Sequence, residues 1–380
     1  MPSLPKKSEP ECISHPDPEV SPPSIQTYPS LRSRPACPHS CRVTPLLPAC
    51  ERVPRTLERE PELKVVGEPG EARRKMRLCF IVEEQYRGDS MPLVIADQLL
   101  RWGHTIDLLE PPETVTCLSD LQSQRYDAFV LKTVSGGPGL SILEAAEAAG
   151  IPTINNSRSI SLVRDKAIAT AFAHAQGLPV PRTYFITHPR LLKKIPQTEY
   201  PLVVKPTNGS SCVGIYRVNG HADLATFDMA ERNPCYFLAQ RYEENAGYDI
   251  KLYVIGKDVY AVAKQSPLHP EVEVEEQPIP LTSEWKKLAL RVGEIFGLDI
   301  YGLDVVATSN GPVVVDINDF PSFGRVPRAV SQVSNYILHI AEQARLRRRR
   351  NSAMVMRAFT ALKPVLQGGH LSQRPSAARE

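Results

Sequence analysis

A strand followed by a small, flexible loop is the strongest local chemical feature of this 380-residue chain. The apolar strand delivers Lys205, and the loop after it carries Gly209, Ser210, Ser211 and Gly214. Glycine and serine permit close backbone approach, so such a loop can direct N–H groups at phosphate oxygens while the lysine supplies a positive charge. A plain hairpin with a lysine that reaches solvent would give the same pattern. The loop therefore predicts a phosphate site only in combination with other features.

Two later strands carry hard oxygen ligands. Asp304 lies in the apolar strand 302–306, and Asp316 and Asn318 lie at the end of the apolar strand 313–317. Residues two apart in a strand face the same side, so these three side chains can converge on one edge of a hairpin. Carboxylates in apolar strands are costly to bury unless they are paired or bind a metal. Because Mg²⁺ (or Mn²⁺) prefers carboxylate and amide oxygens beside nucleotide phosphate, the pattern predicts a magnesium site.

Two polar segments lie between these features. One runs from a strand near Phe237 into a polar connection that ends at Glu243, and the other is the strand 248–255. This second strand carries Asp249 and Lys251 on one face. Together the two segments could bind an adenosine edge and a phosphate, although either one alone is ordinary.

The elements that must position these side chains fall into two regions. The first alternates strands and helices, which is typical of a small parallel-sheet domain. Its predicted strands are 77–82, 105–109 and 126–131, and its predicted helices are about 90–102, 117–123, 140–149 and 159–176. The glycine-rich turn 135–139 could receive an anion, but it lacks the dinucleotide spacing, so a plain strand-to-helix turn is favoured.

The second region is dominated by short strands and is typical of an α+β body. Its predicted strands are 183–186, 201–205, 213–217, 236–240, 248–255, 258–265, 300–307 and 312–317, with helices near 222–231, 284–297 and 327–346. The basic run Arg345–Arg350 extends the last helix and is interpreted as a solvated helix end, with a polyanion site as the alternative. The predicted fold class is therefore multidomain, with an α/β part and an α+β part.

Composition and charge exclude several classes of protein. The apolar runs are too short to span a bilayer, so we expect no membrane partner, and scattered cysteines are typical of a cytoplasmic protein. A net charge of +3 argues against nucleic acid as a partner, and nothing in the sequence indicates an oligomeric state. About 15 of the 36 prolines lie in residues 1–75, which are predicted to be a disordered extension or untranslated sequence ahead of Met76. The cysteines and histidines of this segment match no established zinc module.

The order of these features resembles the ATP-grasp superfamily from about Met76 to Ala341. The motifs that carry the resemblance are Asp165-Lys166 on a helix, Lys205 before its loop, the hinge 240–243, Asp249-Ile250-Lys251, Gly302-Leu303-Asp304 and Asp316-Ile317-Asn318. The helix motif, the run 177–181 and the segment 247–256 are most similar to the RimK-type (alpha-L-glutamate ligase-like) branch. The run 316–321 is also similar to the inositol-tetrakisphosphate kinase branch.

The resemblance implies an ATP-grasp fold with a small N-terminal parallel-sheet (pre-ATP-grasp) domain. The boundaries expected from it are the extension 1–75, the pre-ATP-grasp domain 76–157, the ATP-grasp domain 158–345 with a lid over about 183–243, and a basic polar tail 346–380. It also implies ATP and Mg²⁺ as cofactors.

The resemblance further implies a role for each matching residue. Lys166, Lys205 and a lid over 209–214 are expected to contact the phosphates, and Asp304, Asp316 and Asn318 are expected to bind the metal. The nucleoside is expected to contact a hinge at the adenine, namely Gln240, Arg241, Tyr242 and Glu243, and Asp249 at the ribose. Lys251 is expected to act as a catalytic residue that faces the acceptor or the γ-phosphate.

One segment departs from the glutamate-ligase pattern. After Lys264 that pattern expects an active-site arginine a few residues before an asparagine, but this chain has Gln-Ser-Pro-Leu-His-Pro and then an acidic run over 271–276. Arg325 is the first candidate for a replacement catalytic cation, and His269 is the second. The acidic run is interpreted as a solvated edge rather than as a site for an amine.

The function predicted from the sequence is that of an ATP- and Mg²⁺-dependent carboxylate–amine ligase that forms an amide or peptide bond through an acylphosphate. Its expected partners are small-molecule or peptide carboxylate and amine substrates. A kinase that acts on an inositol polyphosphate or polyol is the first alternative, because the same ATP site could serve it. A non-catalytic nucleotide-binding module is the second, although such a module would not need a complete metal set.

Overall fold

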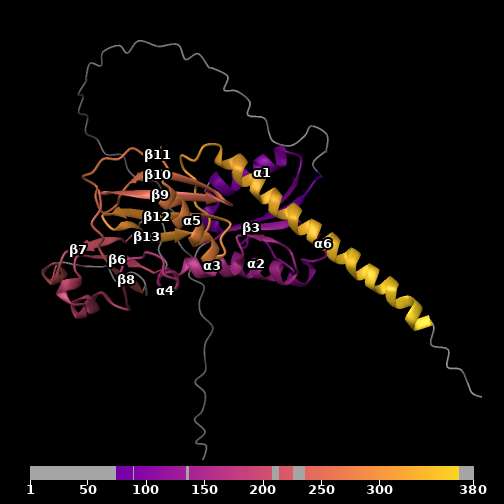
Figure 1. Ribbon diagram of the computed structural model, residues 1–380, viewed down its shortest axis with the longest axis horizontal. Helices are drawn as coiled ribbons and strands as arrows, with labels where there is room; N and C mark the ends of the chain where they lie inside the picture. The colour runs from indigo at the N-terminus through magenta and orange to yellow at the C-terminus, as the bar shows by residue number, and fades with distance from the viewer. Residues whose placement is uncertain (1–73, 89, 134–136, 208–213, 226–235, 368–380) are drawn as a thin grey trace, which may run out of the picture. The chain divides into compact units, whose positions relative to one another are not determined.

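The computed structural model describes residues 74–88, 90–133, 137–207, 214–225 and 236–367, which fall in one compact unit of the chain (Figure 1). The predicted extension 1–75 lies outside this range except for its last two residues. The predicted tail is described as far as Gln367. Three β-sheets organise the described residues, one of them parallel and two antiparallel.

The parallel sheet has the strand order β2-β1-β3-β4. Its strands are β1 (Arg77–Val82), β2 (Thr105–Leu109), β3 (Ala128–Lys132) and β4 (Thr153–Ile154), and the helices α1 (Ser90–Arg101) and α2 (Gly139–Ala148) connect them. The backbone N–H of Gly139 donates to Glu83 at 2.8 Å, so a carboxylate of the chain itself occupies the start of α2. Residues 135 and 136 of the predicted turn before α2 lie outside the described residues.

The predicted helix 117–123 is wrong. This stretch forms only a short 3-10 turn at Leu118–Asp120, and Leu121 is its single buried side chain. One buried apolar contact cannot stabilise an isolated helical segment of this length. The connection therefore stays a surface turn.

The helix predicted over 159–176 is instead two helices, α3 (Ser157–Arg164) and α4 (Lys166–Ala175). Asp165 separates them because its backbone is extended and its carboxylate accepts hydrogen bonds from the N–H groups of Ala167 and Ile168. An aspartate is among the strongest N-cap residues, so it starts a new helix in the middle of an apolar pattern. The break leaves Arg164 and Lys166 next to the end of strand β6 (Leu202–Pro206), where Lys166 N–H donates to the carbonyl of Thr207 at 3.0 Å.

The second sheet is antiparallel, with the order β11-β10-β9-β12-β13. It consists of β9 (Tyr248–Ile255), β10 (Asp258–Gln265), β11 (Gln277–Ile279), β12 (Ile300–Thr308) and β13 (Gly311–Asn318). Helix α5 (Ser283–Phe296) packs on one face through Leu288, Ala289, Val292 and Phe296. Thr282 caps its start, and it ends at Gly297 in the left-handed conformation. The sequence indicated all of these elements except β11.

The register of this sheet brings the polar side chains of four strands onto the face opposite α5. Asp249 pairs with Lys264 of β10, Lys251 pairs with Asp304 of β12, and Asp304 pairs with Asp316 of β13. Paired residues of antiparallel strands point to the same side of a sheet. The two-residue spacing used for the sequence prediction is therefore realised across the whole sheet.

The third sheet is smaller and has the order β5-β8-β6-β7. It contains β5 (Thr183–Ile186), β6 (Leu202–Pro206), β7 (Tyr216–Val218) and β8 (Phe237–Arg241), and β6 delivers Lys205. A 3-10 turn at His221–Ala225 stands where the helix 222–231 was predicted, and the rest of that prediction lies outside the described residues. The loop residues Gly209, Ser210 and Ser211 also lie outside them.

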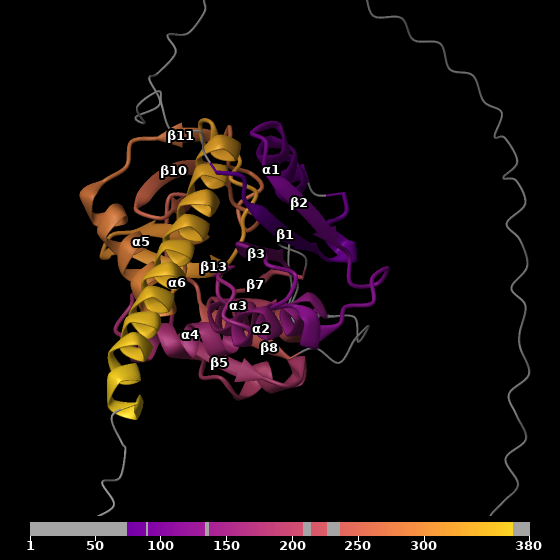
Figure 2. The ribbon, with the colours of Figure 1, turned by 90° about the vertical axis from the view of Figure 1, so that its right-hand side faces the viewer.

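The last helix, α6 (Ala329–Gln367), is longer than the sequence predicted. Its first turns bury Val333, Ile337 and Ala341 in the core that also holds Ile95 and Leu99 of α1. Figures 1 and 2 show α6 in yellow beside α1. The arginine run does not end the helix, because arginine is a good helix former and an exposed turn needs no apolar partner. In the part of the chain that the structure describes, no helix combines the length and apolarity needed to cross a membrane.

Candidate active site

A cavity of about 200 Å³ lies between the polar face of the five-stranded sheet and the smaller sheet. The chain reaches it from β6, β8, β9, β12, β13 and the α3–α4 break. Eleven of the residues predicted for the site line this one cavity: Lys166, Lys205, Gln240, Arg241, Tyr242, Glu243, Asp249, Lys251, Asp304, Asp316 and Asn318. The phosphate, nucleoside and metal predictions therefore converge on a single place.

Two described residues of the prediction do not line it. Gly214 has a positive φ of 77° and stands at the end of the loop between β6 and β7. Arg325 is exposed, has a φ of 61°, and lies in the connection between β13 and α6. The structure thus does not bring Arg325 to the other site residues.

Lysines and carboxylates alternate at the centre of the cavity. Lys166 Nζ forms an ion pair with Asp316, and Lys251 Nζ lies 2.9 Å from Asp304 Oδ1. Lys205 Nζ, on a side chain only 6% exposed, donates to the carbonyl of Val315 at 2.7 Å. Each charged group is thus held by a partner on a different strand or helix, which keeps it in position without a ligand.

The pKa shifts follow from this arrangement. Burial acts to raise the pKa of the Asp316 carboxyl, but the nearby lysines, led by Lys166, outweigh burial and lower that pKa. Burial acts to lower the pKa of the Lys251 ammonium, but Asp304 outweighs it and raises that pKa. The Asp316 carboxylate and the Lys251 ammonium therefore both stay charged at neutral pH.

The donor set suits a hard divalent cation. Among the described residues, no group of three or more His, Cys, Asp or Glu side chains is close enough to hold a metal by itself. The cavity does offer two carboxylates and an amide, and Asn318 Nδ2 donates to Asp304 Oδ2 at 3.3 Å. Magnesium characteristically uses one or two carboxylates together with nucleotide phosphates and water. Asp304, Asp316 and Asn318 therefore fit Mg²⁺ as part of a nucleotide complex.

The predicted adenine hinge is firmly built into the small sheet. The N–H groups of Arg241 and Tyr242 donate to the carbonyls of Arg182 and Pro201, at 2.8 and 2.9 Å. The side chain of Gln240 is buried and donates to Thr183 at 3.0 Å. These bonds leave the carbonyl of Arg241 and the N–H of Glu243 for the predicted adenine contacts.

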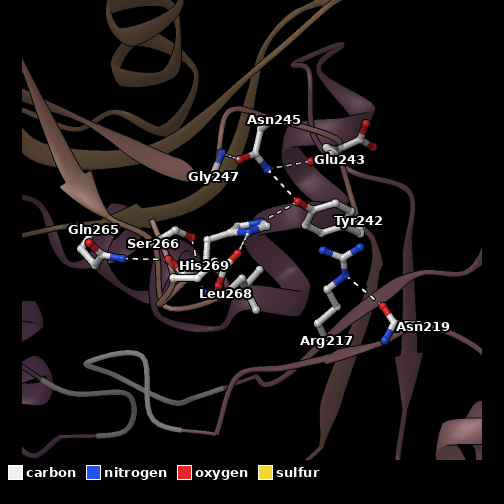
Figure 3. Close-up of polar contacts among 11 residues, drawn as sticks. Arg217, Asn219, Tyr242, Glu243, Asn245, Gly247, Gln265, Ser266, Leu268 and His269 are labelled. Atoms are coloured by element: carbon white, nitrogen blue, oxygen red, sulfur yellow. Dashed lines mark hydrogen bonds and ion pairs between the residues drawn. The ribbon is translucent and has the colours of Figure 1, made fainter. Parts of the chain in front are cut away.

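The side chain of Tyr242 is the centre of a polar network beside the hinge (Figure 3). Its hydroxyl lies 2.6 Å from His269 Nε2, and the guanidinium of Arg217 lies 4.0 Å from the centre of its ring. Asn245 Nδ2 contacts the same hydroxyl at 3.5 Å and donates to the carbonyl of Glu243 at 2.8 Å. His269 therefore lies beside the predicted adenine hinge, not among the lysines.

Asp249, the predicted ribose ligand, is mostly buried. Burial raises the pKa of its carboxyl to about 6, while a hydrogen bond from Ser266 and the charge of Lys264 act in the opposite direction. Ser266 belongs to the segment that departs from the glutamate-ligase pattern, and it also lines the cavity. This contact was not predicted from the sequence.

Sequence reasoning also missed a buried ion pair at the cavity wall. Arg164 Nη2 lies 2.6 Å from Asp319 Oδ1, and the Asp319 side chain is 1% exposed. Burial raises the pKa of the Asp319 carboxyl, and the charge of Arg164 offsets this only in part. The pair joins the residue two before Lys166 to the residue after Asn318. A charged residue in each of two apolar stretches was the available signal, but the pairing is long-range.

Comparison with known proteins shows similarity to ATP-grasp proteins. Residues 163–333 match the family model described as a RimK-like ATP-grasp domain. Over 281 residues the chain is 24% identical to a probable alpha-L-glutamate ligase of Vibrio vulnificus, an alignment that covers 68% of this chain and 92% of that protein.

Solved structures are similar in fold. The ATP-grasp ligase PsnB, in complex with precursor peptide PsnA2 and AMPPNP, has a TM-score of 0.55 at 17% identity, covering 70% of this chain and 97% of its own. PsnB has also been solved with Mg and ADP. The D-alanine–D-alanine ligase of Bacillus anthracis has a TM-score of 0.54 at 16% identity, covering 73% of this chain and 99% of its own.

These comparisons confirm the predicted ATP-grasp fold and the similarity to the RimK-type branch. The relatives are ligases, which agrees with the predicted enzyme class. The domain boundaries, the cytoplasmic location and the roles of individual site residues stay predictions.

Proposed function

We propose that this chain, which carries a RimK-like ATP-grasp domain, is an ATP- and Mg²⁺-dependent carboxylate–amine ligase. The observation that supports this most directly is the cavity in which Lys166, Lys205 and Lys251 meet Asp304 and Asp316. Three cations and two carboxylates around one space suit a metal-bound polyphosphate, because each charge of the ligand finds a partner.

In the proposed reaction a carboxylate oxygen of the first substrate attacks the γ-phosphorus of ATP. An acylphosphate forms, and ADP leaves. The nitrogen of an amine then attacks the acyl carbon, the acyl–oxygen bond to phosphate breaks, and the amine gives up a proton as inorganic phosphate leaves. Such a reaction depends mainly on positioning and charge neutralisation.

The residues of the chain divide this work. Lys166 and Lys205 bind phosphate oxygens, and Lys251 faces the transferred group. Asp304, Asp316 and Asn318 would hold Mg²⁺, which neutralises phosphate charge when it is bound. The carboxylate–lysine pairs keep these groups in place before the nucleotide arrives, so little reorganisation is needed.

The name of the Vibrio vulnificus relative suggests L-glutamate as the first amine to test, and the peptide bound to PsnB suggests a peptide carboxylate as its partner. The run 316–321 also resembles a kinase branch, so transfer of the phosphoryl group to a hydroxyl is the second candidate. The ligase reaction releases the transferred phosphoryl group as free phosphate, whereas the kinase reaction leaves it on the acceptor.

The test is ATP turnover by the full chain with Mg²⁺, across pools of peptides, amino acids and inositol phosphates, with ADP and free phosphate measured separately. The ligase is expected to release ADP and phosphate in equal amounts, only when a carboxylate and an amine are both present. Hydroxylamine should replace the amine and yield a hydroxamate, because it traps acylphosphates. ADP without free phosphate would replace the ligase with the kinase. Binding of ATP without any turnover would support the non-catalytic module instead.

A further inference from the structure

His269 lies beside the predicted adenine hinge, in a loop whose residues 265–268 line the cavity. The sequence suggested it only as a replacement cation for the acceptor, and the comparisons assign it no role. We propose that His269 is a positioning residue for the nucleoside. Its ring connects Tyr242 of the hinge to the loop 265–272, and so makes that loop one wall of the nucleoside site. The inference rests on the proposed ATP site, because it concerns how the same cavity holds adenosine.

The first step is the direction of the hydrogen bonds around the ring (Figure 3). His269 Nδ1 lies 2.9 Å from Glu271 Oε1, and a carboxylate can only accept, so Nδ1 carries the proton. In the neutral ring Nε2 then accepts the hydrogen bond from the Tyr242 hydroxyl at 2.6 Å. Glu271 thereby fixes the ring in the form that can receive Tyr242.

The second step is the rigidity of both partners. The His269 side chain is only 14% exposed and the Tyr242 side chain is buried, so the bond between them is largely shielded from water. Arg217 of β7 covers the tyrosine ring, and its Nε donates to Asn219 at 3.1 Å. A shielded hydrogen bond between two held side chains stabilises their relative position more than an exposed bond would.

The third step is the loop itself. Gln265 Nε2 donates to the carbonyl of His269 at 2.8 Å, and Gln265 Oε1 accepts from the N–H of Val274 at 2.9 Å. These bonds fold the loop so that Ser266, Pro267 and Leu268 line the cavity. Ser266 also hydrogen-bonds Asp249, the predicted ribose ligand.

This loop is the segment in which the glutamate-ligase pattern expects an arginine and an asparagine for the acceptor. Here the same stretch contacts the hinge and the ribose ligand. The loop contacts Tyr242 through His269 and Asp249 through Ser266, whereas the phosphate lysines Lys166 and Lys205 belong to other elements. Loss of the His269–Tyr242 bond should therefore weaken binding of the nucleoside and leave binding of the phosphates intact.

The experiment measures equilibrium binding of two probes to the full chain with Mg²⁺. ADP contacts both halves of the cavity, and inorganic tripolyphosphate contacts only the phosphate half. His269→Phe keeps a ring in place but removes the acceptor, and Tyr242→Phe removes the donor. We expect each variant to bind ADP about tenfold more weakly, while tripolyphosphate affinity changes less than about twofold.

The double variant gives the sharper result. Because both substitutions remove the same bond, the double variant should bind ADP no more weakly than either single variant. His269→Gln retains an amide oxygen that can accept, so it should recover part of the affinity. His174→Phe is the matched control, because His174 is exposed on α4 and should leave both probes unaffected.

Two outcomes overturn the inference while the proposed ATP site stands. Unchanged ADP affinity in His269→Phe would remove the positioning role. Equal losses for ADP and tripolyphosphate would mean that the substitution disturbs the whole cavity, and a purely structural role would replace the proposed one. If the unmodified chain binds tripolyphosphate but not ADP, the proposed ATP site itself fails, and the inference fails with it.

Discussion

Replacing Asp249 by asparagine isolates the effect of one buried charge at the nucleoside site. The side chain lies on β9 next to Ser266 and Lys264, and burial raises the pKa of its carboxyl from 3.8 to about 6. Asparagine has nearly the same shape and can still accept the hydrogen bond from Ser266, but it does not ionise. The substitution therefore removes the titration and little else.

The sign and size of the effect follow from linkage between proton binding and folding. Between about pH 4 and pH 6 the folded chain keeps a proton on Asp249 that the unfolded chain releases. The stability that this group contributes is thus complete below about pH 4 and is lost as pH rises through about 6. Two pKa units at about 1.4 kcal/mol each give at most about 3 kcal/mol.

The assay is urea unfolding of both proteins from pH 4 to pH 8. Relative to the unmodified chain, Asp249→Asn should gain up to about 3 kcal/mol in free energy of unfolding between the two ends of this range. Asp258→Asn, at the exposed first residue of β10 in the same hairpin, controls for the amide itself. A stability difference that does not change with pH would refute the reasoning, because it would mean that the Asp249 carboxyl titrates alike in both states.

Three further substitutions test the remaining parts of the site. Lys205→Met should lower ATP turnover at least about 100-fold while circular dichroism shows an intact fold. Lys257→Met, at an exposed position, should leave ATP turnover unchanged. Equal turnover in both variants would remove Lys205 from the mechanism. Arg164→Met should lower the free energy of unfolding, measured with urea, by about 3–5 kcal/mol because it leaves Asp319 buried and unpaired. Adding Asp319→Leu should restore most of the lost free energy of unfolding. A double variant as unstable as the single variant would contradict this. Asn155→Ala should cost about 2–4 kcal/mol in the same assay, since the amide bonds the backbone of Asp299, Ile300 and Asp319, and a loss below about 0.5 kcal/mol would contradict it.

The sequence predicted the polar face of the large sheet because strand periodicity is local information. Asp316 and Asn318 are two residues apart, and Asp249 and Lys251 are two residues apart, so each pair had to share a face. Once the strands pair, register alone brings these faces together. The same local information failed at Asp165, where an apolar pattern continued through a residue whose capping bonds start a new helix.

Other features depend on contacts that no local pattern contains. Arg164 meets Asp319, and His269 meets Tyr242, only after sheets and loops from distant parts of the sequence have assembled. The histidine also illustrates a limit of pattern comparison. A departure from the family pattern at this segment suggested a replacement cation for the acceptor, whereas in the folded chain the residue contacts Tyr242 of the predicted adenine hinge.

The pairing of the site's charges explains why nucleotide and metal are expected to bind together. Lys166 and Lys251 are each paired with a carboxylate of the predicted metal set, Asp316 and Asp304 respectively. If a phosphate bound a lysine without a cation, the carboxylate paired with that lysine would lose its partner in a mostly buried space. If a cation bound the carboxylates without a phosphate, the lysines would lose their partners in the same way. When both arrive as one complex, every lysine gains a phosphate oxygen while every carboxylate gains the cation. The arrangement therefore favours the metal–nucleotide complex over either component, and it does so through residues whose positions are already fixed by the sheet.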